Sequence, residues 1–299
     1  MTDQIDTNPA LTKLTNVTGD ITIPDMNYLF HYSRVKKPDN NMSHLFTLHY
    51  KESQQENWET SRNLLSQQFV VAKTELILNQ IQQNLGGTIV SQNHYRSNTS
   101  VKAIFTLSGF SIDIPEESDV DLVIFKLITN ITADISLLTS HNLMFSVING
   151  FSGNHALSLN YGLLKTMTSR IGNDDRIIPI NNIFILDKFT KRLIHDNRMS
   201  INIEDVVNVQ RSIQEQVLTF KRLPFGENLV ENMCDKLPKK FSKKFGVLYD
   251  SLPEELRNFY YVSYIWSVLL DIERKIDLEI KVRTMMNVAI ENLLRAERG

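Results

Sequence analysis

Residues 149–162, NGFSGNHALSLNYG, hold three of the chain's 11 glycines and pose the first question about chemistry. A phosphate-binding loop of the G-x-x-x-x-G-K-[ST] kind surrounds phosphates with backbone N–H groups and a lysine, between a strand and a helix. Here no Gly-Lys-Ser/Thr follows, and the β-like run HALSLNY comes after Gly153. Asn-Gly and Ser-Gly-Asn favour the positive φ angles of tight turns. The stretch therefore predicts a turn between antiparallel strands, and not a phosphate loop.

A second candidate for chemistry is the segment PEESDVDLVIF, which begins at Pro115. On a strand, Asp119 and Asp121 would face the same side and could hold magnesium. The pattern resembles the metal-binding strand of the nucleotidyltransferase superfamily, which implies a magnesium-dependent enzyme using these two aspartates. The Gly-Ser pair that grips the triphosphate in that superfamily has no counterpart in LSGFS, residues 107–111. The alternative is a charged hairpin tip at residues 115–119, with Asp121 opening the next strand.

Clustered basic residues in the last third of the chain form the third candidate. Arrays of Lys and Arg bind phosphate backbones, and exposed aromatic rings can add base stacking worth ~1–3 kcal/mol per base. The alternative is a solvated lysine face with the phenylalanines buried in the core. Residues 101–160 hold two bases against six acids, so positive charge is concentrated elsewhere. As a hypothesis, the nucleic-acid-binding residues are Lys221, Arg222, Lys236, Lys239, Lys240, Phe241, Lys243 and Lys244.

A broader pattern runs from Thr74 to about Pro224: strand, acidic turn, strand, then SVINGFSGNHALSLNYGLLKTMTSRI and a helix. It resembles the phage and plasmid family catalogued as domain of unknown function nine-three-two. That family carries an Asn-Ser-His/Tyr-Asp-Gly-Ser-x-Ala turn, followed by an Arg-Val-Val-Cys-x-Asn segment. Asn149, Gly153 and Ala156 fit the turn and Lys165 lies near the arginine position, whereas the family's Asp, Cys and final Asn are missing. The resemblance implies a phage or mobile-element origin and work around DNA replication or recombination, and it supplies no catalytic residues.

The spacing of the histidines does not indicate a metal site, and the single cysteine does not indicate a catalytic nucleophile. His44 and His49 are five residues apart, which places them on one face of neither a helix nor a strand. Cys234 is the only cysteine, which excludes an internal disulfide and any multi-cysteine zinc site. Lysines near Cys234 could lower the pKa of its thiol, but no histidine partner is evident. We expect no cofactor, no metal and no catalytic residue.

The elements that must position these residues follow from periodicity. Apolar residues at spacings of three and four predict a long amphipathic helix over residues 56–85, ended by Gly86-Gly87. A strand is expected at residues 44–50. Short β-rich runs with little room for helices between them predict a mainly antiparallel sheet, at residues 87–96, 101–114, 121–129, 142–149 and 156–164, with a further strand within 175–189. From residue 201 to the end, helical patterns dominate.

The overall composition limits the class of protein and the partners that it can have. Hydrophobic content of 42%, charged content of 22% and a net charge of −2 are ordinary for a soluble globular protein, so nucleic-acid binding requires a local patch. The polar start has no secretory pattern, and the longest apolar run, at residues 259–270, is too short to span a bilayer. We therefore expect a cytoplasmic protein with no membrane partner.

These observations predict an α+β protein with a mainly antiparallel sheet, a long N-terminal amphipathic helix and a helical C-terminal region. The expected domains are a flexible arm (1–27), an α+β core (28–200) and a helical region (201–299). The functional hypothesis is a non-enzymatic phage or mobile-element protein that binds nucleic acid, DNA rather than RNA, through basic helical segments and as a homo-oligomer. Single-strand binding or annealing, in support of DNA replication or recombination, is the expected role. A magnesium-dependent nucleotidyltransferase and a virion structural or assembly protein are the alternatives.

Overall fold

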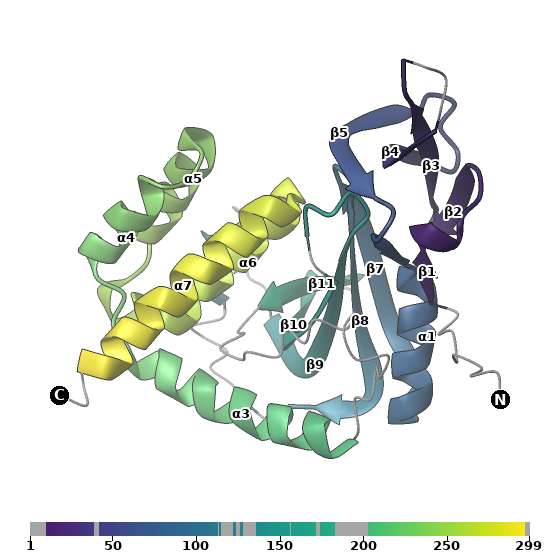
Figure 1. Ribbon diagram of the computed structural model, residues 1–299. Coiled ribbons are helices and arrows are strands. Elements are labelled where there is room, and N and C mark those ends of the chain that lie inside the picture. Colours follow the sequence, from purple (N-terminus) through teal and green to yellow (C-terminus); the bar gives the residue numbers. More distant parts are fainter. Residues whose placement is uncertain are drawn as a thin grey trace. The chain divides into compact units, whose positions relative to one another are not determined.

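The computed structural model describes residues 10–38, 42–112, 114, 122–123, 126–127, 136–155, 157–171, 174–182 and 203–296 (Figure 1). Antiparallel strands and helices are both present, which confirms the α+β class. The chain divides into two compact units: unit 1 contains Met1–Phe105, Ser146–Asn160 and Phe189–Ile203, and unit 2 contains Thr106–Phe145, Tyr161–Lys188 and Glu204–Gly299. Each unit therefore combines segments that are distant in the sequence.

Unit 1 contains a four-stranded antiparallel sheet with the order β2-β3-β4-β5. Its strands are β2 (Ile21–Asp25), β3 (Tyr28–Lys36), β4 (Met42–Glu52) and β5 (Glu59–Ser66), and a separate pair joins β1 (Leu11–Lys13) to β6 (Val70–Ala72). Alternate residues of β3, namely Tyr28, Phe30 and Tyr32, are buried, because successive side chains of a strand point to opposite faces. β1 and β2 lie within the predicted arm, and Ile23 is only 2% exposed, so this part of the arm is ordered against the rest of unit 1.

The predicted helix over residues 56–85 is wrong in its first half. Residues 59–66 form β5, and the helix α1 spans only Thr74–Leu85. Leu65 is buried and Leu64 is exposed, as the alternation of a strand requires, and both pair with β4. The sequence ETSRNLLS mixes good helix formers (Glu, Arg and Leu) with poorer ones (Thr, Ser and Asn), so helix propensity is weak and cross-strand pairing decides its conformation. The predicted end of the helix is confirmed, since Gly86 is left-handed with φ 65°.

A buried carboxylate holds the start of α1. Lys73, at the N-cap, gives no side-chain cap, and Asp25 of β2 supplies the acceptor instead: its Oδ1 accepts the N–H of Glu75 at 2.9 Å. Asp25 is 2% exposed, and this burial raises its pKa to about 6. Its Oδ2 has no hydrogen-bond partner. The anchor of α1 is therefore also a titratable group near neutral pH.

A five-stranded sheet has the order β11-β10-β9-β8-β7. Its strands are β7 (Ile89–Ser97), β8 (Ser100–Ser111), β9 (Ser136–Gly150), β10 (Ser158–Ile171) and β11 (Asp174–Asn182), which confirms most of the predicted β-rich runs. The run at residues 121–129 differs: residues 122–123 and 126–127 are helical, because a short apolar run does not distinguish a strand from a buried helix. Asp119 and Asp121 lie outside the described residues.

Unit 2 ends in helices, as predicted (Figure 1). They are α3 (Ile203–Arg222), α4 (Glu227–Cys234), α5 (Lys239–Asp250), α6 (Phe259–Glu273) and α7 (Ile276–Ala296). Asn258 caps α6 by accepting the N–H of Tyr261 at 3.1 Å, and Arg274 ends α6 in the left-handed conformation. The apolar run at residues 259–270 is the buried part of α6. No helix among the described residues has the length and apolarity needed to cross a membrane.

Candidate nucleic-acid interface

The glycine-rich segment at residues 149–162 forms the predicted turn. β9 ends at Gly150, and β10, its neighbour in the sheet, begins eight residues later in the chain. Gly153 has a φ of +74°, and a Cβ at Gly150 would lie 2.5 Å from the carbonyl oxygen of His155. Both glycines are therefore required by the turn itself.

Polar side chains of this turn bind other parts of unit 1. Asn149 donates to the carbonyl of Ala72 at 2.7 Å and to Thr74 Oγ1 at 3.1 Å. The hydroxyl groups of Ser152 and Thr99 are hydrogen-bonded to each other. These hydrogen bonds hold the turn against neighbouring segments of unit 1. The turn therefore has a structural role.

The lysines of α5 lie on the outside of unit 2. Residues four apart share a helix face, so Lys239 lies beside Lys243 and Lys240 beside Lys244. All four are exposed, as is Lys236 just before the helix. The structure therefore places four of the predicted binding residues on the exposed side of α5, with Lys236 exposed three residues before the helix begins.

Phe241 requires a correction, because the sequence hypothesis gave it a role in base stacking. Phe241 is 2% exposed and Phe245 is fully buried. Both rings pack on Trp266 of α6, with ring centroids 5.4 Å and 3.6 Å away. An aromatic ring that packs against the core cannot also stack on a nucleic-acid base, so these residues anchor α5 and leave the lysines to face the solvent.

Two contacts link α5 and the segment before it with α6 and α7, which carry further cations that the sequence hypothesis did not include. Lys244 Nζ pairs with Glu273 of α6 at 3.2 Å, and Lys281 Nζ of α7 donates to the carbonyl of Lys236. Arg274 and Lys275, both exposed, follow Glu273 directly. We call this set the basic surface: Lys236, Lys239, Lys240, Lys243, Lys244, Arg274, Lys275 and Lys281.

Lys221 and Arg222, at the end of α3, lie apart from the first lysines of α5. Tyr249, at the other end of α5, donates to the carbonyl of Phe225 at 2.6 Å, just beyond α3. The helical rise puts Tyr249 roughly 15 Å along the axis from Lys239. Arg222 is exposed, whereas Lys221 is half-buried with its Nζ 5.0 Å from the Tyr260 ring centroid.

Lys221 belongs instead to a buried cluster of unit 2. Lys165 of β10 is 2% exposed, and its Nζ lies 5.3 Å from the ring centroid of Tyr264. His141 of β9 is 8% exposed, and burial together with the charges of Lys165 and Lys221 lowers its pKa to about 4. The imidazole is therefore neutral at physiological pH, and its Nε2 has no hydrogen-bond partner.

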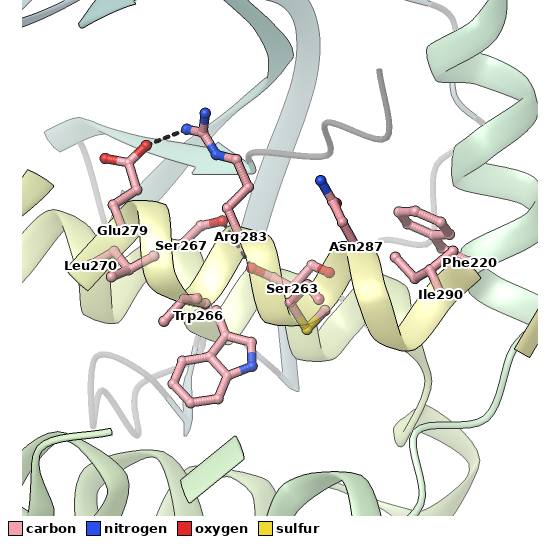
Figure 2. A pocket seen from close by; sticks show the side chains of 11 residues that line it. Phe220, Ser263, Trp266, Ser267, Leu270, Glu279, Arg283, Asn287 and Ile290 are labelled. Carbon is pink, nitrogen blue, oxygen red and sulfur yellow. Dashed lines mark hydrogen bonds and ion pairs between the residues drawn. The ribbon is translucent and has the colours of Figure 1, made fainter. Parts of the chain in front are cut away.

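A small cavity lies among α3, α6 and α7 (Figure 2). Glu279 and Arg283 form an ion pair there, and Glu279 is 2% exposed. Arg283 Nε and Trp266 Nε1 have no hydrogen-bond partner. The cavity measures about 30 Å³, which accommodates about two water molecules and is far below the volume of a metabolite pocket. It fits internal hydration of the buried ion pair, and not a substrate.

Thiol and metal chemistry find little support in the described structure. Cys234 is half-buried, and this burial raises the pKa of its thiol, contrary to the lowering that nearby lysines could cause. Ser242 Oγ donates to the carbonyl of Cys234 at 2.8 Å, which ties the end of α4 to α5. Within the part of the chain that the structure describes, no group of three or more His, Cys, Asp or Glu side chains could hold a metal ion.

Comparisons with known proteins leave the site to be interpreted from its own geometry. No protein-family model, no curated protein and no solved structure matches this chain.

Proposed function

We propose that this protein is a non-enzymatic nucleic-acid-binding protein that contacts the phosphate backbone through the basic surface. The observation that carries the proposal is a set of eight exposed cationic side chains on α5, the segment before it, the α6–α7 turn and α7, which the Lys244–Glu273 ion pair and the Lys281–Lys236 hydrogen bond connect. The chain as a whole has a net charge of −2, so this concentration of positive charge is local. Local arrays of this kind supply sequence-independent affinity for polyanions.

The buried phenylalanines refine the proposal. Because Phe241 and Phe245 pack on Trp266 and Tyr249 is buried too, the exposed side of α5 offers four lysines and no aromatic ring. Binding at α5 is therefore electrostatic, and it depends on the number of phosphates contacted rather than on base identity. We propose DNA as the ligand, in keeping with the hypothesis from the sequence.

The test is a salt titration with a fluorescein-labelled 30-nucleotide single-stranded DNA of mixed sequence, followed by fluorescence anisotropy. With about five phosphate contacts, the slope of log K against log salt concentration is about −3.5, so affinity falls about 100-fold between 50 and 200 mM salt. Changing Lys239 and Lys240 to Ala together should weaken binding about tenfold at 50 mM salt and make the slope shallower by about 1.4.

A matched control is available in unit 1. Lys36 and Lys37 are also adjacent and exposed, and the Lys36→Ala/Lys37→Ala variant loses the same charge from residues that do not belong to the basic surface. It should bind like the unchanged protein. Absence of binding at 50 mM salt, or an equal loss in the control, would contradict the proposal.

A further inference from the structure

A mostly apolar groove lies between α4 and α7 in unit 2. Its volume is about 250 Å³, and its apolar wall includes Leu229 and Met233 of α4 with Met285 and Val288 of α7. Val288 is 53% exposed, a large value for an apolar side chain in the middle of a helix. The amide side chains of Asn232 and Asn292 also line the groove.

The groove adjoins the basic surface. Lys236 belongs to both, since it lines the groove and follows α4. Lys281 donates to the carbonyl of Lys236 and lies one helical turn before Met285 on α7. A ligand in the groove is therefore flanked by ammonium groups from α7 and from the segment between α4 and α5, which favours an apolar group attached to a polyanion.

We propose that the groove receives one unpaired base of a single-stranded nucleic acid while the flanking phosphates bind Lys236 and Lys281. This inference rests on the proposed function and specifies its substrate class. The volume is smaller than that of a pocket for a drug-sized ligand and suits a single ring system. The thioethers of Met233 and Met285 make favourable contacts with aromatic rings.

The polar lining also suits a base. The side-chain amides of Asn232 and Asn292 carry both donors and acceptors, which are the groups that base edges recognise. Asn232 uses one N–H to donate to the carbonyl of Asn228 at 2.7 Å, which holds the side chain against α4. In a duplex the bases are stacked and paired, and extruding one costs free energy, so a single strand places a base in the groove most readily.

The experiment compares three fluorescein-labelled probes by anisotropy at 50 mM salt: a 20-nucleotide oligo-dT, an abasic strand with the same number of phosphates, and a 20-base-pair duplex. The unchanged protein should bind oligo-dT at least tenfold more tightly than the abasic strand. The Met285→Gln/Val288→Gln variant, which keeps the charge, should bind the two equally while its affinity for the abasic strand stays the same.

Val207 of α3 provides the matched control, because it is also an exposed apolar residue of a helix, at 43% exposure. Val207→Gln should retain the preference for oligo-dT. A second measurement needs no variant: irradiation of the unchanged protein with a strand containing 5-iodouracil should crosslink a peptide from residues 284–292.

The outcomes separate the two proposals. Equal binding of oligo-dT and the abasic strand by the unchanged protein overturns the base site, while the electrostatic function stands. A preference that survives the Met285→Gln/Val288→Gln change, with crosslinks elsewhere, also overturns it and leaves the groove to a protein partner. No binding of any probe overturns both proposals.

Discussion

At the scale of single residues, Glu273 controls how much positive charge the basic surface presents. It accepts an ion pair from Lys244 at 3.2 Å, and it immediately precedes Arg274 and Lys275. The Lys244 side chain is 42% exposed and that of Glu273 is 21% exposed, so the pair is partly solvated. Pairs of this kind contribute about 0–1 kcal/mol to stability. Glu273 can therefore be changed with little effect on folding.

We expect Glu273→Gln to bind nucleic acid more tightly. The change removes the negative charge and releases Lys244 for a phosphate, so affinity for a 30-nucleotide single strand should rise about threefold to tenfold at 50 mM salt, with a steeper salt dependence. Anisotropy titrations measure both quantities. Glu227→Gln is the control, since Glu227 pairs with Arg257, outside the basic surface, at 3.9 Å. Tighter binding by Glu227→Gln, or no increase in affinity for Glu273→Gln, would contradict the role of Glu273 in limiting the charge of the basic surface.

At the scale of elements, replacing either of two glycines by alanine should change the free energy of unfolding, and in opposite directions. A Cβ at Gly150 would meet the backbone of His155 at 2.5 Å, whereas a Cβ at Gly246, inside α5, would meet nothing within 4 Å. Gly150→Ala should lower the free energy of unfolding by about 2–3 kcal/mol. Gly246→Ala should raise it by about 0.5–1 kcal/mol, because alanine favours the helix. Urea unfolding at neutral pH measures both, and a neutral Gly150→Ala would show that the turn can rearrange.

The strongest periodicities predicted their elements from sequence. In α5, Phe241, Phe245 and Tyr249 recur every four residues and are all buried. Residues 59–66 show where periodicity fails: Leu64 and Leu65 fit a helical spacing, yet pairing with β4 makes a strand. The spacing of apolar residues could not reveal this, because it carries no information on pairing with β4, which ends at Glu52, seven residues before β5 begins.

The candidate site was predictable only where its residues are contiguous. The lysines of residues 236–244 form a visible run, but whether Phe241 faced the core or a ligand depended on the packing of Trp266. Arg274, Lys275 and Lys281 alternate with acids such as Asp277, so no charge run marks them. Their place beside α5 comes from tertiary contacts.

At the scale of the whole molecule, two buried side chains, one in each unit, have acid–base equilibria with opposite effects on stability. Asp25 belongs to unit 1 and His141 to unit 2. Strands β8, β9 and β10 each have residues in both units, so we expect a single cooperative unfolding transition that reports both groups.

The direction for Asp25 follows from its raised pKa of about 6 against 3.8 for the free side chain. Between these values the folded state binds the extra proton, so acid stabilises the fold, and this contribution is lost as the pH rises through about 6. The difference of about two pH units corresponds to roughly 3 kcal/mol.

His141 acts in the opposite direction. Its pKa is lowered from 6.5 to about 4 by burial and by Lys165 and Lys221. Between these values the unfolded state binds the extra proton, so acid destabilises the fold. This contribution is fully present above about pH 6.5 and is lost as the pH falls through about 4, again by roughly 3 kcal/mol.

The two groups should therefore offset each other, and separate variants should reveal them. Relative to the unchanged protein, Asp25→Asn should be more stable at pH 7 by on the order of 2–3 kcal/mol, an advantage that disappears by pH 4. The difference for His141→Gln should change in the opposite direction, rising by a similar amount from pH 7 to pH 4. In the double variant the two changes should cancel, leaving a curve parallel to that of the unchanged protein. Urea unfolding at pH 7, 6, 5 and 4 tests all three. A single variant whose stability runs parallel to the unchanged protein at every pH would show that its buried group does not titrate as described.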